Sequence, residues 1–257
     1  MKPRILLVND DGIFAPGLKH LWRAVVDFAD VTIVAPDAER SGAGSSLTLK
    51  DPIHIDAVKW ESNTPAWKVT GTPADCVRLA ISVILDEKPD LILSGINKGS
   101  NSGRTLLYSG TVGGVIEGVM RDIPGVAFSS GEFDNPNYAL AEKHIPTVVH
   151  HLLEHPLPTG TLLNVNFPES VSAIKGFKLA RQGRGYWMED PDHRLHPEGH
   201  SYYWLGGKWA DHEEGEESDV ALLKQGYMTA VPVHIHELTH HAFLESRKSS
   251  FENLRFD

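Results

Sequence analysis

Cysteine is nearly absent from this 257-residue sequence, in which Cys76 is the single one. An internal disulfide is therefore excluded, and this usage favours a reducing compartment, for which we expect the cytoplasm. No apolar run approaches the length needed to cross a bilayer, and no apolar signal segment precedes the first predicted strand. We therefore expect no membrane partner.

Basic residues are also in short supply, because 24 Lys and Arg face 34 Asp and Glu, which gives a formal net charge of -10. Such a balance argues against a nucleic-acid polymer as the partner. It leaves a small phosphorylated substrate open, since one metal ion and a few backbone amides reverse the field locally.

Strand and helix patterns alternate through the first half of the chain. Apolar runs predict strands at 4–9, 31–35, 90–94 and 126–130, and helical spacing predicts helices from Pro16, at 76–86, at 111–120 and at 138–153. Segments 50–60 and 67–70 look extended and are expected to pair as a hairpin. The predicted fold class is α/β, with a Rossmann-like, mostly parallel sheet flanked by helices.

The second half changes character after a further core strand at 162–167. We expect a catalytic core at 1–180 and a smaller, hairpin-rich C-terminal region at 181–257, which adds a strand at 228–235 and a terminal helix at 243–254. Such a region is suited to contacts between subunits, and we expect a homodimer or homotetramer. The carboxylate-rich stretch at 211–219 is interpreted as a solvated loop.

The most informative local feature is the pair Asp10 and Asp11, which follows Asn9 and a short apolar strand. Ligand sites in open α/β sheets lie just beyond the carboxyl ends of the strands. Adjacent carboxylates repel each other there, and a hard divalent cation such as Mg²⁺ or Mn²⁺ relieves that repulsion. On this fragment alone, a turn capped by the two acids remains the alternative.

Three more segments are expected at the same edge of the sheet: the Ser- and Gly-rich loop at 40–46, the loop at 95–103, and the segment 108–111 that opens into a helix. Free N–H groups at a helix start, beside the hydroxyls of Ser109 and Thr111, make a site the size of a phosphate. Each segment alone is weak support, since such residues also form ordinary turns. Together they predict a site for a metal ion and a phosphate.

These segments, read together, resemble the SurE nucleotidases, also called stationary-phase survival proteins. The resemblance spans roughly the first 130 residues in the order that the family shows, and it thins beyond them. The matching motifs are Val-Asn-Asp-Asp-Gly at 8–12, Ala-Pro at 35–36, Arg-Ser-Gly at 40–42, Ser-Leu-Thr at 46–48, Gly-Thr-Pro-Ala-Asp-Cys-Val at 71–77, Ser-Gly-Ile-Asn-Lys-Gly at 94–99 and Tyr-Ser-Gly-Thr-Val-Gly at 108–113.

The resemblance implies a metal-dependent phosphatase that hydrolyses nucleoside 5′- and 3′-monophosphates with one divalent cation per subunit, Mg²⁺ or Mn²⁺. By resemblance the metal ligands are Asp10, Asp11, Ser41 and Asn97, all hard oxygen donors. We expect the catalytic groups to be Asp10, Asp11 and Asn9, with metal-activated water as the nucleophile. The expected substrate and phosphate contacts are Asn9, Gly42, Asn97, Asn101, Ser109, Gly110 and Thr111.

Three other functions compete with this one. A broader acid phosphatase or exopolyphosphatase activity is the nearest, and a non-catalytic, Mg-dependent nucleotide- or phosphate-binding signalling module is the alternative from another class. The sequence from His236 to His240 also matches the zinc-protease motif H-E-x-x-H. That motif requires both histidines on one helical face, whereas this one follows a predicted strand that contains Pro232.

Overall fold

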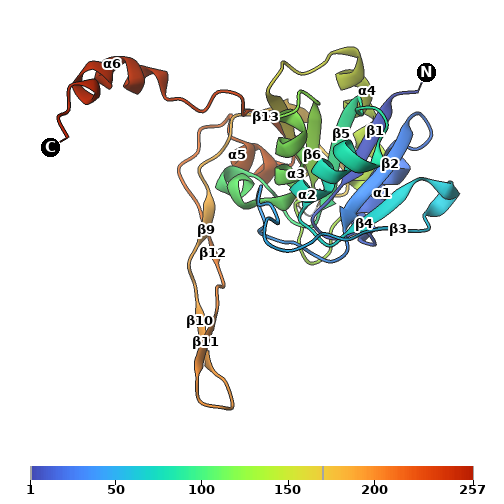
Figure 1. The fold of residues 1–257 in the computed structure, drawn as a ribbon, viewed down its shortest axis with the longest axis horizontal. Helices are drawn as coiled ribbons and strands as arrows, with labels where there is room; N and C mark the ends of the chain where they lie inside the picture. Colours follow the sequence, from blue (N-terminus) through green and yellow to red (C-terminus); the bar gives the residue numbers. More distant parts are fainter. Residues whose placement is uncertain (1, 170, 257) are drawn as a thin grey trace.

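The computed structural model describes residues 2–169 and 171–256 and is built on one nine-stranded sheet (Figure 1). The strand order is β3-β4-β2-β1-β5-β6-β7-β13-β8, with six central strands parallel and β3 and β13 antiparallel to their inner neighbours. The strands are β1 (Arg4–Val8), β2 (Asp30–Pro36), β3 (Ile55–Ala57), β4 (Ala66–Val69), β5 (Leu91–Asn97), β6 (Gly125–Ser129), β7 (Thr161–Asn166), β8 (Phe177–Leu179) and β13 (Met228–His234).

The direction in which strands are added to the sheet reverses between β1 and β5. From β1 the chain adds β2 and β4 on one side, and it then crosses back to place β5, β6 and β7 on the other. Such a switch point opens a crevice at the carboxyl ends of the two strands beside it, because the flanking loops diverge there. Here those ends carry Asn9 to Asp11 after β1 and Asn97 at the end of β5.

Helices cover both faces of the sheet, as the alternation predicted. Alternate residues of β1 point to opposite faces, so Leu7 joins the apolar cluster of α1 (Pro16–Val25) and α4 (Tyr138–Glu154), while Leu6 packs with α2 (Pro73–Leu79). The helix α3 (Gly110–Val119) packs against α2, and its Val115 reaches a further cluster on β6 and β7. The carboxyl ends of the strands therefore stand on a rigid two-sided core.

The second helix starts where its sequence signal places it. The Thr72 hydroxyl accepts a hydrogen bond from Asp75 N, and the Asp75 carboxylate accepts one from Thr72 N, which completes a capping box. A π-helical stretch, Ala80–Ile84, continues α2 toward the predicted end. The predicted hairpin is also present, since β3 and β4 pair antiparallel, although the strand part is shorter than segment 50–60.

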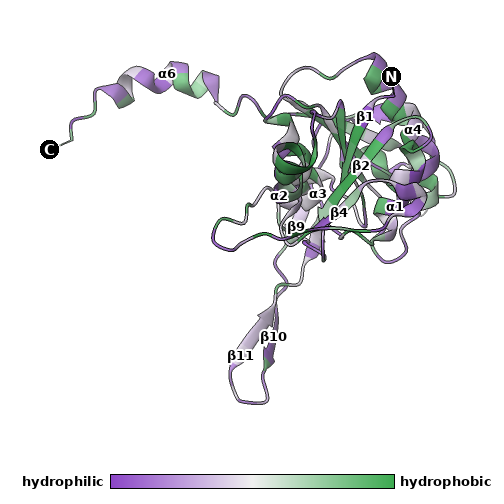
Figure 2. Cartoon of the chain, turned by 45° about the vertical axis from the view of Figure 1, so that its right-hand side comes forward, coloured by the Kyte–Doolittle hydropathy of each residue, from purple (hydrophilic) through white to green (hydrophobic). Residues whose placement is uncertain are grey.

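The C-terminal region forms an arm and returns to the core. Strands β9 (Tyr186–Met188), β10 (Asp192–Leu195), β11 (Ser201–Trp204) and β12 (Lys208–Ala210) build a long hairpin that extends away from the body, and α6 (His241–Glu252) projects separately (Figures 1 and 2). Between them, α5 (Asp219–Lys224) leads into β13, which pairs with β7 inside the main sheet. Segment 181–257 thus contains the predicted hairpin and helix, but its strand belongs to the core sheet.

Of the helices in the described part of the chain, none combines the length and the apolar character that crossing a membrane requires.

Candidate active site

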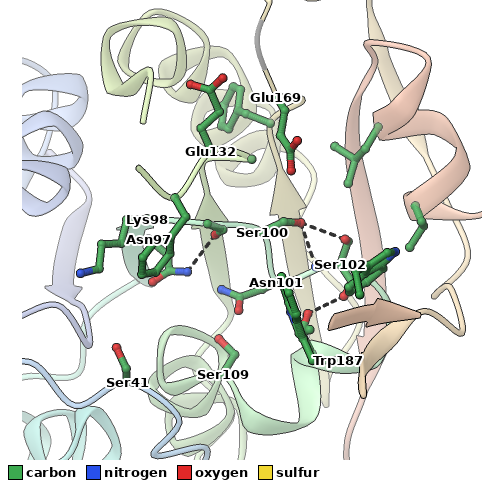
Figure 3. Close-up of a pocket in the computed structure, with 18 of the residues that line it drawn as sticks. Ser41, Asn97, Lys98, Ser100, Asn101, Ser102, Ser109, Glu132, Glu169 and Trp187 are labelled. Carbon is green, nitrogen blue, oxygen red and sulfur yellow. Dashed lines mark hydrogen bonds between the residues drawn. The ribbon is translucent and has the colours of Figure 1, made fainter. Parts of the chain in front are cut away.

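A cleft of about 1400 Å³ opens at the carboxyl edge of the sheet, at the switch point. Its walls come from the loops after β1, β2, β5, β6 and β7, the start of α3, the helix α5 and the hairpin pair β9 and β12 (Figure 3). Six of the residues singled out in the sequence line it: Asp10, Ser41, Gly42, Asn97, Asn101 and Ser109. The structure therefore brings together segments separated by up to about a hundred residues.

Asp10 is a buried residue that lines this cleft, and it is held from two directions. Its Oδ1 accepts a hydrogen bond of 2.6 Å from the Thr111 hydroxyl, and its backbone oxygen accepts one of 2.7 Å from Arg40 N. Burial raises the pKa of Asp10, and the hydrogen bond from Thr111 acts in the opposite direction. A side chain so enclosed is fixed in one orientation, with Thr111 as its positioning residue.

Asp11 stands beside Asp10 and shares its electrostatic conflict. Its pKa is raised to about 6, first by burial and then by repulsion from Asp10, while the Lys98 N–H, 3.4 Å from its Oδ2, opposes the shift. Asn9 lies deeper, where its Nδ2 donates to Gly12 O at 2.9 Å and its buried Oδ1 has no hydrogen-bond partner in the described structure. Two crowded acids make a site that favours a cation.

The two other predicted ligands come from loops tied to these acids. The loop with Ser41 is fixed by the Arg40 bond to Asp10 and by Gly44 N, which donates to Tyr108 O at 3.0 Å. The side-chain N–H of Asn97 donates to Gly99 O at 2.9 Å, so the carboxamide oxygen is the atom that remains to bind a cation. Both residues line the cleft together with Asp10.

The helix α3 begins against the acids, and its glycines are needed for that closeness. A Cβ on Gly110 would stand 2.8 Å from Asp10 Cβ, and one on Gly113 would stand 2.0 Å from Gly44 O. Ser109 is the N-cap, its hydroxyl accepting from Val112 N at 3.1 Å, and it faces the cleft. The start of α3 thus supplies Ser109 to the cleft and Thr111 to Asp10.

Asn101 is the centre of a buried polar network that fixes the loop after β5. Its Nδ2 donates to Ser129 Oγ at 2.8 Å, its backbone N–H donates to Asn166 Oδ1 at 2.8 Å, and its carbonyl accepts from Asn164 Nδ2 at 2.9 Å. These partners lie at the ends of β6 and β7. The network holds the loop that carries Asn97 in register with the sheet, because buried polar groups are stable only when paired.

Several lining residues escaped the sequence analysis. Lys98 lies 3.3 Å from Glu39 and 5.0 Å from the Phe133 ring centre, and it brings a positive charge into an acidic cleft. Its position directly after the strand β5 could have identified Lys98 as a cleft residue from the sequence. Trp187 and Trp209 reach the cleft from the arm. Trp187 lies on the side of Asn101 that faces away from Ser41 (Figure 3). No local pattern pointed to them.

The carboxylate-rich segment 211–219 is predicted to be a solvated loop, and for two of its carboxylates this is wrong. Asp219 is fully buried and accepts hydrogen bonds from Gly103 N at 3.0 Å, Gly183 N at 2.8 Å and Val220 N at 2.8 Å. Glu214 accepts from Gly185 N at 3.1 Å. These two carboxylates accept hydrogen bonds from backbone N–H groups where the arm leaves the core. A count of charges in the sequence does not reveal this role.

We expect Asp219→Ala to lower the free energy of unfolding by about 2–5 kcal/mol, because three buried N–H groups lose an acceptor. Chemical denaturation followed by circular dichroism measures the change. The matched control is Asp211→Ala, from the same segment, whose side chain is exposed and pairs with Lys224 at the surface; its stability should stay within experimental error. Equal stability of the two variants would contradict the anchoring role of Asp219.

The zinc-protease reading of 236–240 finds no support in the geometry. His236 lies in the turn after β13, with its Nε2 3.1 Å from Val119 O, and His240 is the N-cap of α6, its Nδ1 accepting from Phe243 N at 3.0 Å. The motif is therefore divided between a turn and a helix cap, rather than presented on one helical face.

Together, the fold and the site define a Rossmann-like α/β protein whose ligand cleft is built around an acid pair at the switch point of the sheet. The chain belongs to the survival protein SurE family, whose family model matches residues 5–189.

Similar proteins extend this match to nearly the full chain. A 5′-nucleotidase SurE of Protochlamydia amoebophila is 50% identical over 254 residues, which covers 98% of this chain and 97% of that protein. A 5′-nucleotidase SurE of Christiangramia forsetii is 41% identical over 252 residues and covers 96% of both. The crystal structure of a SurE protein from Aquifex aeolicus superposes with a TM-score of 0.82 at 38% identity, covering 97% of this chain and 100% of that one. The family resemblance and the fold class expected from the sequence are thereby confirmed.

Proposed function

We propose that this chain is a metal-dependent nucleotidase that hydrolyses nucleoside 5′- and 3′-monophosphates to nucleoside and phosphate. The observation that carries the proposal is the acid pair at the carboxyl end of β1, of which Asp10 lines a cleft of about 1400 Å³ and Asp11 is its direct neighbour in the chain. Such a volume accommodates a whole nucleotide, since typical small-molecule pockets measure about 300–1,000 Å³. Relatives that align over nearly the whole chain carry the name 5′-nucleotidase SurE.

The donor set suits one divalent cation, Mg²⁺ or Mn²⁺. The residues that would hold it are Asp10, Asp11, Ser41 and Asn97, whose carboxylate, hydroxyl and amide oxygens are hard donors. A cation bound there supplies Lewis-acid stabilisation of phosphoryl oxygens and a more acidic water. The repulsion that raises the pKa of Asp11 disappears when a positive charge joins the pair.

The chain's own groups position the phosphate and move the proton. Ser109 presents its hydroxyl from the start of α3, where the helix dipole favours negative charge. Gly42 and Asn101 line the same cleft, and the Lys98 ammonium adds a cationic contact for the phosphoryl oxygens. Asn9 supports the turn beneath the acids. We assign proton transfer to the acid pair, of which Asp11 is the more accessible member.

The nucleobase is assigned to the side of the cleft that the arm provides. Trp187 on β9 and Trp209 on β12 both line it, and their ring centres lie 5.7 Å apart in an edge-to-face arrangement. Aromatic faces stack on bases of every kind, with about 1–3 kcal/mol per base in single-stranded nucleic-acid complexes. This arrangement favours a substrate with a planar ring over a bare phosphate ester.

The arm also supports the expected assembly as a homodimer or homotetramer, while the single cysteine favours the cytoplasm as its compartment. Its outer strands expose Leu195, Tyr203 and Trp204, each more than half accessible. Exposed apolar and aromatic groups concentrated on a protruding element are typical of contacts between subunits.

The test is a panel assay of phosphate release from 5′- and 3′-monophosphates of the common nucleosides, with p-nitrophenyl phosphate and polyphosphate as comparison substrates. We expect the monophosphates to be hydrolysed with the highest kcat/KM. Binding of nucleotides without release of phosphate would instead establish the non-catalytic binding module, and a preference for polyphosphate would establish the exopolyphosphatase.

A further inference from the structure

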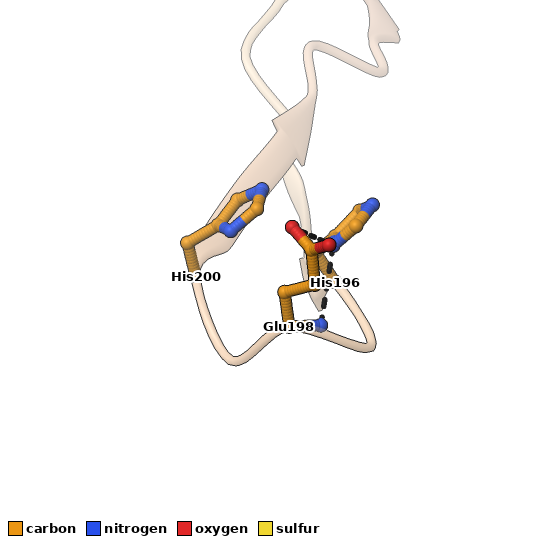
Figure 4. Close-up of side chains that lie close together, drawn as sticks. All are labelled: His196, Glu198 and His200. Carbon is orange, nitrogen blue, oxygen red and sulfur yellow. Dashed lines mark hydrogen bonds and ion pairs between the residues drawn. The ribbon is translucent and has the colours of Figure 1, made fainter.

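The far end of the arm gathers three metal-ligating side chains that the nucleotidase site does not use. His196 follows β10, His200 precedes β11, and Glu198 stands at the apex between them (Figure 4). One ligand atom from each, an imidazole nitrogen or a carboxylate oxygen, lies within 4.8 Å of the other two. We propose that this cluster is a second metal site, selective for Zn²⁺ and distinct from the cation site in the cleft.

The hairpin turn itself brings the two imidazoles together. The strands pair with Leu195 opposite Ser201, so the next residues outward, His196 and His200, face each other across the ladder. His196 N donates to His200 O at 2.9 Å, which closes the turn. The two rings are nearly parallel, at 13°, with centres 4.3 Å apart. Their proximity is therefore set by backbone pairing rather than by chance contact of two long side chains.

The apex is shaped to bring the carboxylate to the same place. Gly199 adopts a φ of 89°, and its N–H donates to His196 O at 2.8 Å, so the chain turns tightly after Glu198. The Glu198 N–H donates to Nδ1 of His196 at 3.2 Å, and its Oε2 lies 3.8 Å from the same nitrogen. A carboxylate thus stands beside two stacked imidazoles.

The chemistry of the donors selects the ion. Two imidazoles and one carboxylate form a three-ligand zinc set that leaves a fourth position for water, with Zn–N distances of about 2.0–2.1 Å. Mg²⁺ and Mn²⁺ instead favour oxygen donors. All three side chains are exposed, so small rotamer changes suffice to close the remaining distance to an ion. The tip is thus suited to zinc, and the cleft to a harder ion.

The same hairpin contains a control that is matched in type and exposure. His193 on β10 stacks on Tyr203, with ring centres 4.8 Å apart, and its Nε2 lies 3.1 Å from Ser201 Oγ. It belongs to the same arm and the same residue type, but it is outside the cluster. The tip lies far out on the arm (Figure 1). Substitutions of His193 or of the three cluster residues therefore leave the cleft untouched.

The experiment is a zinc titration of the full-length, chelator-treated protein in excess Mg²⁺. Zinc also binds oxygen donors, so the readout is the difference in bound zinc between variants of the tip. For the wild type and for His193→Ala, we expect calorimetry to show one tight Zn²⁺ per chain at the tip in addition to any zinc in the cleft. The double variant His196→Ala, His200→Ala should lose this binding, and Glu198→Gln should weaken it by at least about tenfold, the lower range for removal of even an outer partner of a metal site.

Histidine side-chain NMR locates the zinc independently of its stoichiometry. The imidazole signals assigned to His196 and His200 should shift on addition of one equivalent, while that of His193 stays in place. Phosphatase activity in Mg²⁺ should be the same for all variants, because the tip is remote from the cleft. The same zinc stoichiometry in the double variant and the wild type, or unshifted His196 and His200 signals in the wild type, would overturn the proposal.

Discussion

Replacing Asp10 by asparagine is expected to lower kcat/KM for nucleoside monophosphates by on the order of 10³-fold or more, since it removes a charge at the centre of the reacting groups. The carboxamide keeps the shape of the side chain and can still accept from Thr111. Burial raises the pKa of Asp10. At a pH above the ordinary carboxyl pKa, the ionised side chain therefore destabilises the folded protein relative to the unfolded chain. Loss of the charge should therefore leave the stability of the metal-free protein at neutral pH unchanged or increased.

Steady-state kinetics and thermal unfolding of the same preparation separate these two effects. Asp11→Asn is expected to lose activity and keep its stability in the same way, since burial and then repulsion from Asp10 raise the pKa of Asp11. The control is Asp56→Asn on β3, an exposed acid that pairs with Lys68 far from the cleft. It should retain full activity. An active and stable Asp10→Asn enzyme would refute the central role of the acid pair.

Removal of divalent cations is expected to reduce phosphate release to the level of the uncatalysed reaction. Dialysis against EDTA followed by Mg²⁺ or Mn²⁺ should restore it, because the cleft gathers carboxylate, hydroxyl and amide oxygens around a local excess of negative charge. The measurement is phosphate release before chelation, after chelation and after addition of each ion. Full activity in excess EDTA would contradict a metal-dependent mechanism.

A binding readout connects that result to the proposed ligands. A ligand that binds only the folded state stabilises it by about 2.7 kcal/mol at a concentration 100 times its Kd. Mg²⁺ should therefore raise the unfolding temperature of the wild type by several degrees and leave Asp10→Asn unaffected. The double substitution of His196 and His200 should leave the Mg²⁺ effect intact, since those imidazoles belong to the tip of the arm.

Much of the core could be predicted because its signals are local. Apolar runs of strand length, helical spacing after Pro16 and the capping box at Thr72 each act within a few residues, and each element formed at the expected place. The acid pair was also predictable, since it directly follows β1 and strand ends carry ligands in such sheets. Its burial and the contact of Asp10 with Thr111 required the fold.

By itself, the sequence determined the α/β class, the alternating core, and the segments that carry Asp10, Ser41, Asn97 and Ser109. Only the tertiary structure decided that Trp187 enters the cleft, that β13 joins the core sheet and that Asp219 is a buried anchor. The physical reason is the range of the interactions. Periodicity and capping depend on neighbours in the chain, whereas Asp219 is fixed by an N–H more than a hundred residues away.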